Sequence, residues 1–154
     1  MKIIDRLPIP DRPHVVSVGG DVAQVYRNQI VVWLSINDVL RPLPAILDTG
    51  HGHNLSISAK HLSRWSGATL ERIGELEMDR RRVVQYAADV RLHRNVRGRT
   101  ELKGDSYPLE TPQGITVLSD EHAPRLPLIG LRMIVANKLR LVIDGKNREI
   151  TISN

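Results

Sequence analysis

The sequence contains no cysteine and no phenylalanine, and only 3% of its 154 residues are aromatic. The absence of cysteine excludes disulfide bonds and metal sites built on thiolates. With so few aromatic residues, the core has to be built from Leu, Ile, Val and Ala, and such a core suits short β-strands better than a helical bundle. The length predicts one domain that is large enough to bury a sizeable core.

Long hydrophobic runs are also absent. No apolar run approaches the length that a membrane-spanning helix needs, and residues 1–5 do not open a secretory signal. We therefore expect no membrane partner and a cytoplasmic location.

The charge balance is basic, with a net charge of +5 and a pI near 10. Such a balance raises nucleic-acid binding as a function. However, acidic residues interleave with the basic ones, and aromatic side chains that could stack on bases are scarce. We therefore interpret the charge as a solvated basic surface that favours acidic partners or substrates, and we do not expect a nucleic-acid partner.

One acidic residue directly follows an apolar run: Ala, Ile and Leu at positions 45–47 precede Asp48-Thr49-Gly50. The apolar residues indicate the end of a buried strand, and Gly50 permits the sharp turn that must follow. This arrangement leaves the Asp48 carboxylate at the rim of a hydrophobic core, where its protonation can be tuned. An ordinary turn is the alternative interpretation of the same residues.

A second apolar run ends in glycine at Leu128-Ile129-Gly130, and a short strand is predicted before it at residues 115–118. Upstream of Asp48, residues 30–36 predict another strand. The order of strand, Asp-Thr-Gly, strand, long hairpin, strand and apolar-apolar-Gly resembles the retropepsin family, the retroviral-type aspartic proteases and their bacterial soluble relatives. The resemblance covers roughly residues 29–131 and lies in pattern rather than identity.

The resemblance implies an all-β fold: a closed barrel or sandwich of short strands with a flap hairpin and one or two short helices. We expect residues 29–154 to form this single domain and residues 1–28 to be an irregular lead-in with one possible strand at 14–18. From local patterns we also expect a helix at 59–66 that is capped by Ser58 and stopped by Gly67, a helix at 131–138, and a closing hairpin from 139 to 152. Residues 95–114 are interpreted as a surface loop.

By the same resemblance, the protein is expected to be an aspartic endopeptidase without a cofactor. Two carboxylates sharing one proton are needed for this chemistry, and the sequence has a single Asp-Thr-Gly. The second carboxylate must therefore be Asp48 of another copy, so a symmetric homodimer is predicted. Thr49 would hydrogen-bond across the twofold axis, and Gly50 would let its peptide lie close to the carboxylates.

The expected substrate is an extended peptide or a partly unfolded protein, held mainly by backbone hydrogen bonds. Between two strands predicted in residues 68–93, the charged segment 79–82 is the expected hairpin tip and would act as the flap. The predicted substrate-binding residues, from the flap, the catalytic loop and the pocket walls, are Met78, Asp79, Arg80, His51, Gly52, Ala123, Pro124, Leu128 and Ile129.

Some residues depart from the family pattern. Position 51 usually holds Ala or Ser in the viral enzymes but holds His51 here, and the hairpin tip has arginines instead of glycine. A protease-like dimeric module that binds a peptide or an acidic partner without cleaving it therefore remains the alternative function. His51 and His53, with Asp48 or His61 nearby, are an alternative metal site, but no distant cluster of ligands matches them, so no metal is expected.

Overall fold

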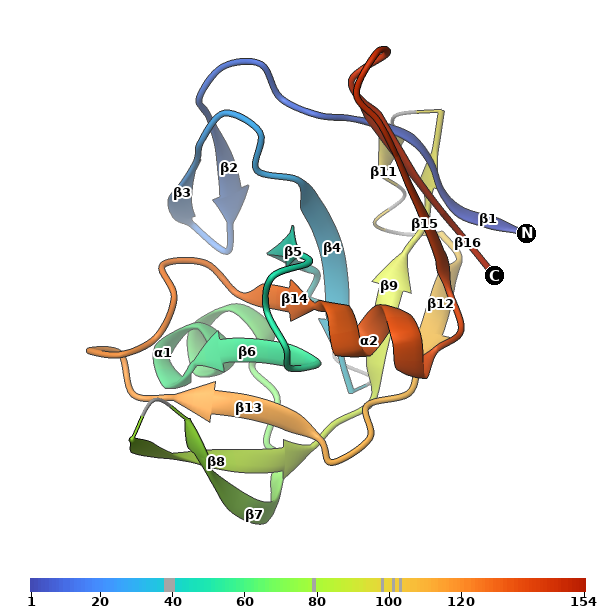
Figure 1. Ribbon diagram of the computed structural model, residues 1–154. Coiled ribbons are helices and arrows are strands. Elements are labelled where there is room, and N and C mark those ends of the chain that lie inside the picture. Colours follow the sequence, from blue (N-terminus) through green and yellow to red (C-terminus); the bar gives the residue numbers. More distant parts are fainter. Residues whose placement is uncertain (38–40, 79, 98, 101, 103) are drawn as a thin grey trace.

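The computed structural model describes the chain except for residues 38–40, 79, 98, 101 and 103. It is built mainly of strands, which confirms the predicted all-β class (Figure 1). The elements in chain order are β1 (Lys2–Pro8), β2 (His14–Val18), β3 (Asp21–Val25), β4 (Val31–Ile36), β5 (Leu43–Asp48), β6 (Leu55–Ser58), α1 (Ala59–His61), the π-helical turn η1 (Leu62–Ser66), β7 (Glu71–Met78), β8 (Arg81–Ala87), β9 (Val90–His93), β10 (Asn95–Val96), β11 (Arg99–Thr100), β12 (Ser106–Leu109), β13 (Ile115–Leu118), β14 (Leu128–Gly130), α2 (Leu131–Ala136), β15 (Arg140–Asp144) and β16 (Glu149–Ser153).

The largest sheet has the strand order β12-β9-β4-β5-β14-β6-β13-β8-β7. Three of its inner strands are almost completely buried: the first five residues of β5 are buried, and so are all four residues of β6 and of β13. By contrast, β4 alternates between half-buried and buried residues, as a strand with one covered face does. The strand that carries Asp48 therefore runs through the middle of this sheet.

A second sheet has the order β11-β10-β1-β16-β15 and joins the two ends of the chain. In it, β1 pairs with the antiparallel β16, with Ile4 opposite Ile152. The expectation of an irregular lead-in at residues 1–28 is wrong, because this segment contains β1 as well as the hairpin of β2 and β3. Proline residues hid the first strand in the sequence, although the buried Ile3 and Ile4 supply its apolar positions. The division into two segments at residue 28 stays a prediction.

Two further expectations need correction. Among the described strands the sheets are open, with β12 and β7 at the two edges of the nine-stranded sheet, so the expected closure into a barrel is wrong. Residues 95–114, interpreted as a loop, contain β10, β11 and β12. Strand β12 forms because it pairs with β9 along four residues and buries Leu109, a tertiary contact that the polar local sequence does not reveal.

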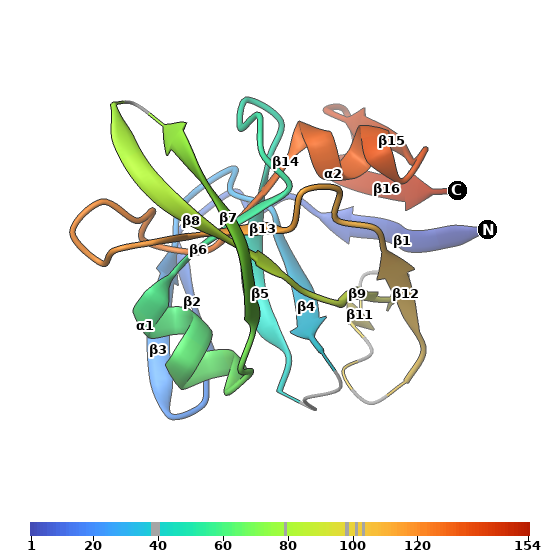
Figure 2. The same cartoon turned by 90° about the horizontal axis from the view of Figure 1, so that it is seen from below.

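The local predictions for the helices and the closing hairpin are confirmed. The Ser58 hydroxyl accepts a hydrogen bond from the backbone N–H of His61 at 3.0 Å, and Gly67 ends the helical segment with a φ of 65°. Helix α2 begins directly after β14, and β15 pairs with β16 over five residues. Figure 2 shows the hairpin of β7 and β8 projecting from one end of the molecule and β15 lying at the other end.

Replacing Ser58 with alanine is expected to lower the free energy of unfolding by about 1 kcal/mol, because the N–H of His61 loses its capping acceptor. Urea denaturation of the two proteins measures this difference. The Ser58→Thr variant keeps the hydroxyl and is the matched control. An unchanged urea midpoint in Ser58→Ala would contradict the capping role.

The core consists mainly of Leu, Ile, Val and Ala, as the composition predicts, together with Trp65 and Met133. Trp65 is 4% exposed, and its indole N–H donates to Asp21 at 2.9 Å. This bond ties the short helix to the hairpin of β2 and β3. Across the described ranges, none of the helices has both the length and the apolar character that crossing a bilayer requires.

Candidate active site

Asp48 is the last residue of β5, and it is half-buried while the five residues before it are buried. Its Oδ1 accepts a hydrogen bond from the backbone N–H of Gly50 at 3.0 Å, and its carbonyl oxygen accepts from His51 N–H at 3.0 Å. Thr49 and Gly50 are exposed. The sequence therefore positions a carboxylate at the rim of the core, on a turn that is open to a second molecule.

The two motifs noted in the sequence lie side by side. Strand β14 runs parallel to β5, and Gly130 is the register partner of Asp48. A Cβ atom at Gly130 would collide with the carbonyl oxygens of His51 and His53, because the loop after Asp48 crosses directly over this glycine. The N–H of Gly130 donates to the Asn54 carbonyl at 2.9 Å, and the N–H of Leu131 donates to the His51 carbonyl at 2.8 Å. Gly130 thus fixes the path of the candidate catalytic loop.

The loop of residues 49–54 is also held by side chains that the sequence did not single out. Asn54 is 3% exposed, and its Nδ2 donates to the carbonyl oxygens of Pro112 at 2.6 Å and Gly114 at 3.1 Å. The Ser56 hydroxyl lies 2.7 Å from Nε2 of His51. Serine alternates with apolar residues along β6, so the local pattern does not single out Ser56, whereas Asn54 depends on residues about 60 positions away.

His51 turns its ring into the protein rather than into open solvent. Burial lowers the pKa of His51 below its ordinary value of 6.5; the nearby His53 lowers it further, and Asp48 opposes the shift. The ring centroids of His51 and His53 are 5.2 Å apart. At neutral pH the lowered pKa favours the neutral form of His51, which adds no positive charge beside Asp48.

This histidine makes stability depend on pH. The pKa of His51 is lower in the folded chain than in the unfolded chain, so the unfolded chain takes up a proton first as the pH falls below 6.5. Acidification therefore favours unfolding, and His61, whose pKa burial also lowers, acts in the same direction. We expect His51→Gln to lose less stability than the wild type between pH 7 and about 5.

Urea midpoints measured across this pH range test the expectation, with the same replacement at the exposed His14 as the control. Parallel pH curves for the wild type and His51→Gln would contradict it.

The predicted flap residues lie on the hairpin of β7 and β8, where Met78 is the register partner of Arg81. Arg80 is exposed and has a φ of 64°, as a tight turn requires, whereas Asp79 lies outside the described residues. The sheet order places β13, β6 and β14 between β8 and β5. The hairpin therefore belongs to the same sheet as Asp48 but does not neighbour its strand, and its role as a flap stays a prediction.

The other predicted pocket residues differ in their exposure. Gly52 is exposed in the loop after Asp48, and Leu128 is half-buried on β14. Ala123 and Pro124 are half-buried in the connection between β13 and β14, where the N–H of Ala123 donates to the Ser119 carbonyl at 3.0 Å. Ile129 is only 3% exposed and packs in the core, since neighbouring strand residues face opposite sides, so it is not available to line a pocket of this chain.

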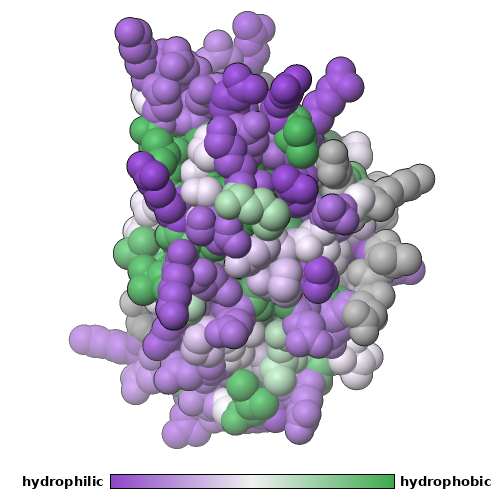
Figure 3. All heavy atoms as spheres, turned by 90° about the vertical axis from the view of Figure 1, so that its right-hand side faces the viewer, coloured by the Kyte–Doolittle hydropathy of each residue, from purple (hydrophilic) through white to green (hydrophobic). Residues whose placement is uncertain are grey.

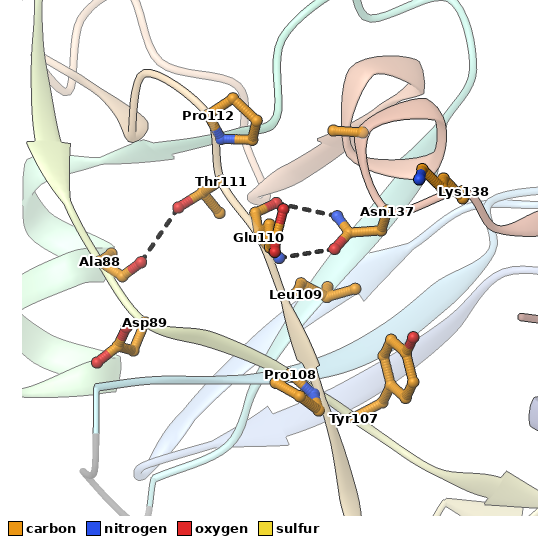
Figure 4. Close-up of a pocket in the computed structure, with 11 residues that line it drawn as sticks. Ala88, Asp89, Tyr107, Pro108, Leu109, Glu110, Thr111, Pro112, Asn137 and Lys138 are labelled. Carbon is orange, nitrogen blue, oxygen red and sulfur yellow. Dashed lines mark hydrogen bonds between the residues drawn. The ribbon is translucent and has the colours of Figure 1, made fainter.

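A cavity of about 780 Å³ lies elsewhere, between β12, the segment after it and the end of α2 (Figure 4). The side chain of Asn137 reaches across this region, with Oδ1 accepting from Glu110 N–H at 2.6 Å and Nδ2 donating to the Glu110 carbonyl at 2.9 Å. None of the described residues that line the cavity is a predicted site residue. These two hydrogen bonds connect the end of α2 to the residue that follows β12, and the sequence did not predict them.

For the alternative of a metal site, the described residues add no third ligand to His51 and His53. In the part of the chain that the structure describes, His, Asp and Glu side chains form no group of three or more that could hold an ion.

Comparisons with known proteins find similar solved structures but no similar sequence. No protein-family model and no curated protein sequence matches the chain. Among solved structures, the EIAV protease in complex with the inhibitor HBY-793 is similar, with 17% sequence identity and a TM-score of 0.43. The match covers 74% of this chain and 92% of the protease chain. At this identity and TM-score, the similarity does not establish a family for the chain.

Proposed function

We propose that the protein is an aspartic endopeptidase that acts as a homodimer of the retropepsin type. The observation that carries the proposal is the pairing of the two sequence motifs, in which Gly130 of Leu128-Ile129-Gly130 is the register partner of Asp48. This pairing supports a built site, because it fixes a half-exposed carboxylate on an open turn at the middle of a rigid sheet. A simple surface turn would not need the loop to cross Gly130 so closely.

Hydrolysis of a peptide at this site requires a second carboxylate. One carboxylate takes a proton from the attacking water, while the protonated partner donates to the carbonyl oxygen of the scissile bond. Because each chain contains a single Asp-Thr-Gly, the second group would be Asp48 of the partner subunit. The exposure of Thr49 and Gly50 supports this, since both residues are free to meet the same loop of a second chain.

The proposed substrate is an extended peptide segment. Strand β7 is an edge of the nine-stranded sheet, and its hairpin with β8 projects beyond the body of the molecule (Figure 2). In the dimer this hairpin would cover the peptide and exclude water from the two carboxylates. Gly52, the half-buried Leu128 and the loop with Ala123 and Pro124 would contact the peptide side chains.

The test is mass-spectrometric profiling of a diverse peptide library between pH 4 and 8, with the Asp48→Asn chain as the blank. We expect cleavage to be strongest at mildly acidic pH, because one carboxyl group of the pair has to hold a proton. Specific activity is also expected to fall on dilution below the dissociation constant of the dimer. A folded dimer that cleaves no peptide would favour the protease-like binding module instead.

A further inference from the structure

Strand β15 is an open edge of the five-stranded sheet. It pairs with β16 over five consecutive residues without a register shift, and no other described strand lies on its outer side. A straight edge of this kind presents unpaired backbone N–H and C=O groups that can pair with another strand. The register shifts that interrupt the pairing of β1 with β16 are not found here.

The side chains of this edge are unusually apolar for an exposed strand. Val142 is 41% exposed and Ile143 is 55% exposed. Ile143 is the register partner of Ile150, which is fully buried, so Ile143 stands on the side of the sheet that faces the core. On this face Leu141 is half-buried against the core, whereas Ile143, one step further along the strand pattern, is more than half exposed at the edge.

Helix α2 continues this apolar edge. Leu131 is 45% exposed and Val135 is 66% exposed. In Figure 2 the loop after β5, helix α2 and the hairpin of β15 and β16 lie along the same upper edge of the molecule. Figure 3 shows the right-hand side of Figure 1 as mostly hydrophilic, with hydrophobic groups at its left margin, which is the front of Figure 1, and others at the lower centre and upper right.

The sequence of β15 is complementary to itself in the antiparallel direction. It reads Arg140-Leu141-Val142-Ile143-Asp144. If two copies pair about a twofold axis at Val142, Arg140 lies opposite Asp144 of the partner subunit, and Leu141 lies opposite Ile143 of the partner subunit. Opposite charges and apolar side chains are favourable cross-strand partners. The same contacts occur twice because a twofold interface repeats each of them.

Within one chain the charge of Asp144 is poorly balanced. Its cross-strand partner on β16 is Glu149, and like charges directly opposite one another repel. Both carboxylate oxygens accept hydrogen bonds from Asn147, Oδ1 from the backbone N–H at 3.0 Å and Oδ2 from the side chain at 2.9 Å. These bonds lower the pKa of Asp144 and keep it ionised. An arginine from a second copy would supply the missing opposite charge.

We propose that β15 is the seam of the homodimer, in which two copies pair β15 with β15 about a twofold axis at Val142 and join their sheets. The inference rests on the proposed function for the role of the dimer and specifies how its two chains are joined. One twofold axis along the edge seen in Figure 2 serves both contacts, because the loop after β5 and β15 face the same side. The paired strands would thereby hold the two Asp48 residues near each other.

The test uses charge reversal at the two ends of β15. Arg140→Asp and Asp144→Arg each place like charges opposite one another in their own homodimer. We expect each variant to raise the dimer dissociation constant, measured by sedimentation equilibrium, at least about tenfold. Mixing the two variants restores both opposite-charge pairs, so the heterodimer is expected to bind within about threefold of the wild type. Arg99→Asp, the same change on β11 at the other edge of the sheet, is the matched control.

Recovery on mixing also shows that each variant chain is folded. If neither charge reversal weakens the dimer, β15 is not the seam, and the proposed function is unaffected. The same conclusion follows if Arg99→Asp weakens the dimer as much as the two reversals do. A wild-type chain that stays monomeric at all concentrations would overturn the seam too. Peptide cleavage is measured separately: weakening and rescue without any cleavage would support the seam and contradict the proposed function.

Discussion

Replacing Asp48 with asparagine is expected to lower kcat/KM for peptide cleavage by about 10⁴-fold while the melting temperature stays nearly unchanged. The amide cannot take a proton from water, whereas its oxygen can still accept the hydrogen bond from Gly50 N–H that Oδ1 of Asp48 accepts. Kinetics and thermal unfolding measured on the same preparation separate the two effects. Asp105→Asn, at a carboxylate that is 86% exposed and distant in the sequence, is the matched control.

The same variant tests whether the two carboxylates come from two chains. In an equal mixture of wild-type and Asp48→Asn chains that exchange freely, about a quarter of the dimers contain two aspartates, so about a quarter of the activity should remain. A site complete within one chain would keep half of the activity. Cleavage by pure Asp48→Asn at the wild-type rate would remove Asp48 from the mechanism altogether.

Gly130→Ala is expected to destabilise the chain by at least about 3 kcal/mol or to prevent folding. The added Cβ would overlap the backbone carbonyl oxygens of His51 and His53, and backbone atoms cannot move aside as the end of a flexible side chain can. The φ of Gly130 is −97°, which alanine adopts readily, so the effect is one of space rather than of conformation.

Urea denaturation measures this effect, and Gly52→Ala is the matched control because nothing lies within 4 Å of a Cβ at that position. We expect the Gly52 variant to keep its free energy of unfolding within about 0.5 kcal/mol. A Gly130→Ala chain as stable as the wild type would mean that the loop after Asp48 does not pass where the structure puts it.

The sequence predicted those features that local patterns determine. An apolar run followed by Asp48-Thr49-Gly50 predicted the end of a buried strand, and Ser58 with Gly67 predicted the limits of a short helical segment. Both follow from backbone rules that operate within a few residues. The sequence showed Asp48 and Leu128-Ile129-Gly130 only as two motifs in a family-like order, and the register of β5 with β14 places Gly130 beside Asp48.

Features that depend on distant partners were missed. Strand β1 exists because β16 pairs with it, and the prolines at positions 8, 10 and 13 pointed to irregular structure. The amide of Asn54 anchors the candidate catalytic loop through carbonyl groups of residues 112 and 114, which no local pattern connects to it. The described sheets are open, whereas a closed barrel was predicted. Strand patterns specify which face of a strand is buried but not whether the edges of the sheet meet, so they could not reveal this.

The pairing of β1 with β16 has a consequence for how the protein is made. Ile4 is the register partner of Ile152, so among the described strands β1 has no antiparallel partner until the segment up to residue 152 has left the ribosome. Pairing between such distant segments is slow, since a long loop has to close first. Strand β15 needs the same late step, because β16 supports it. If β15 joins the two subunits, a nascent chain cannot present this strand to a second copy until residues 149–153 have been made and paired with it.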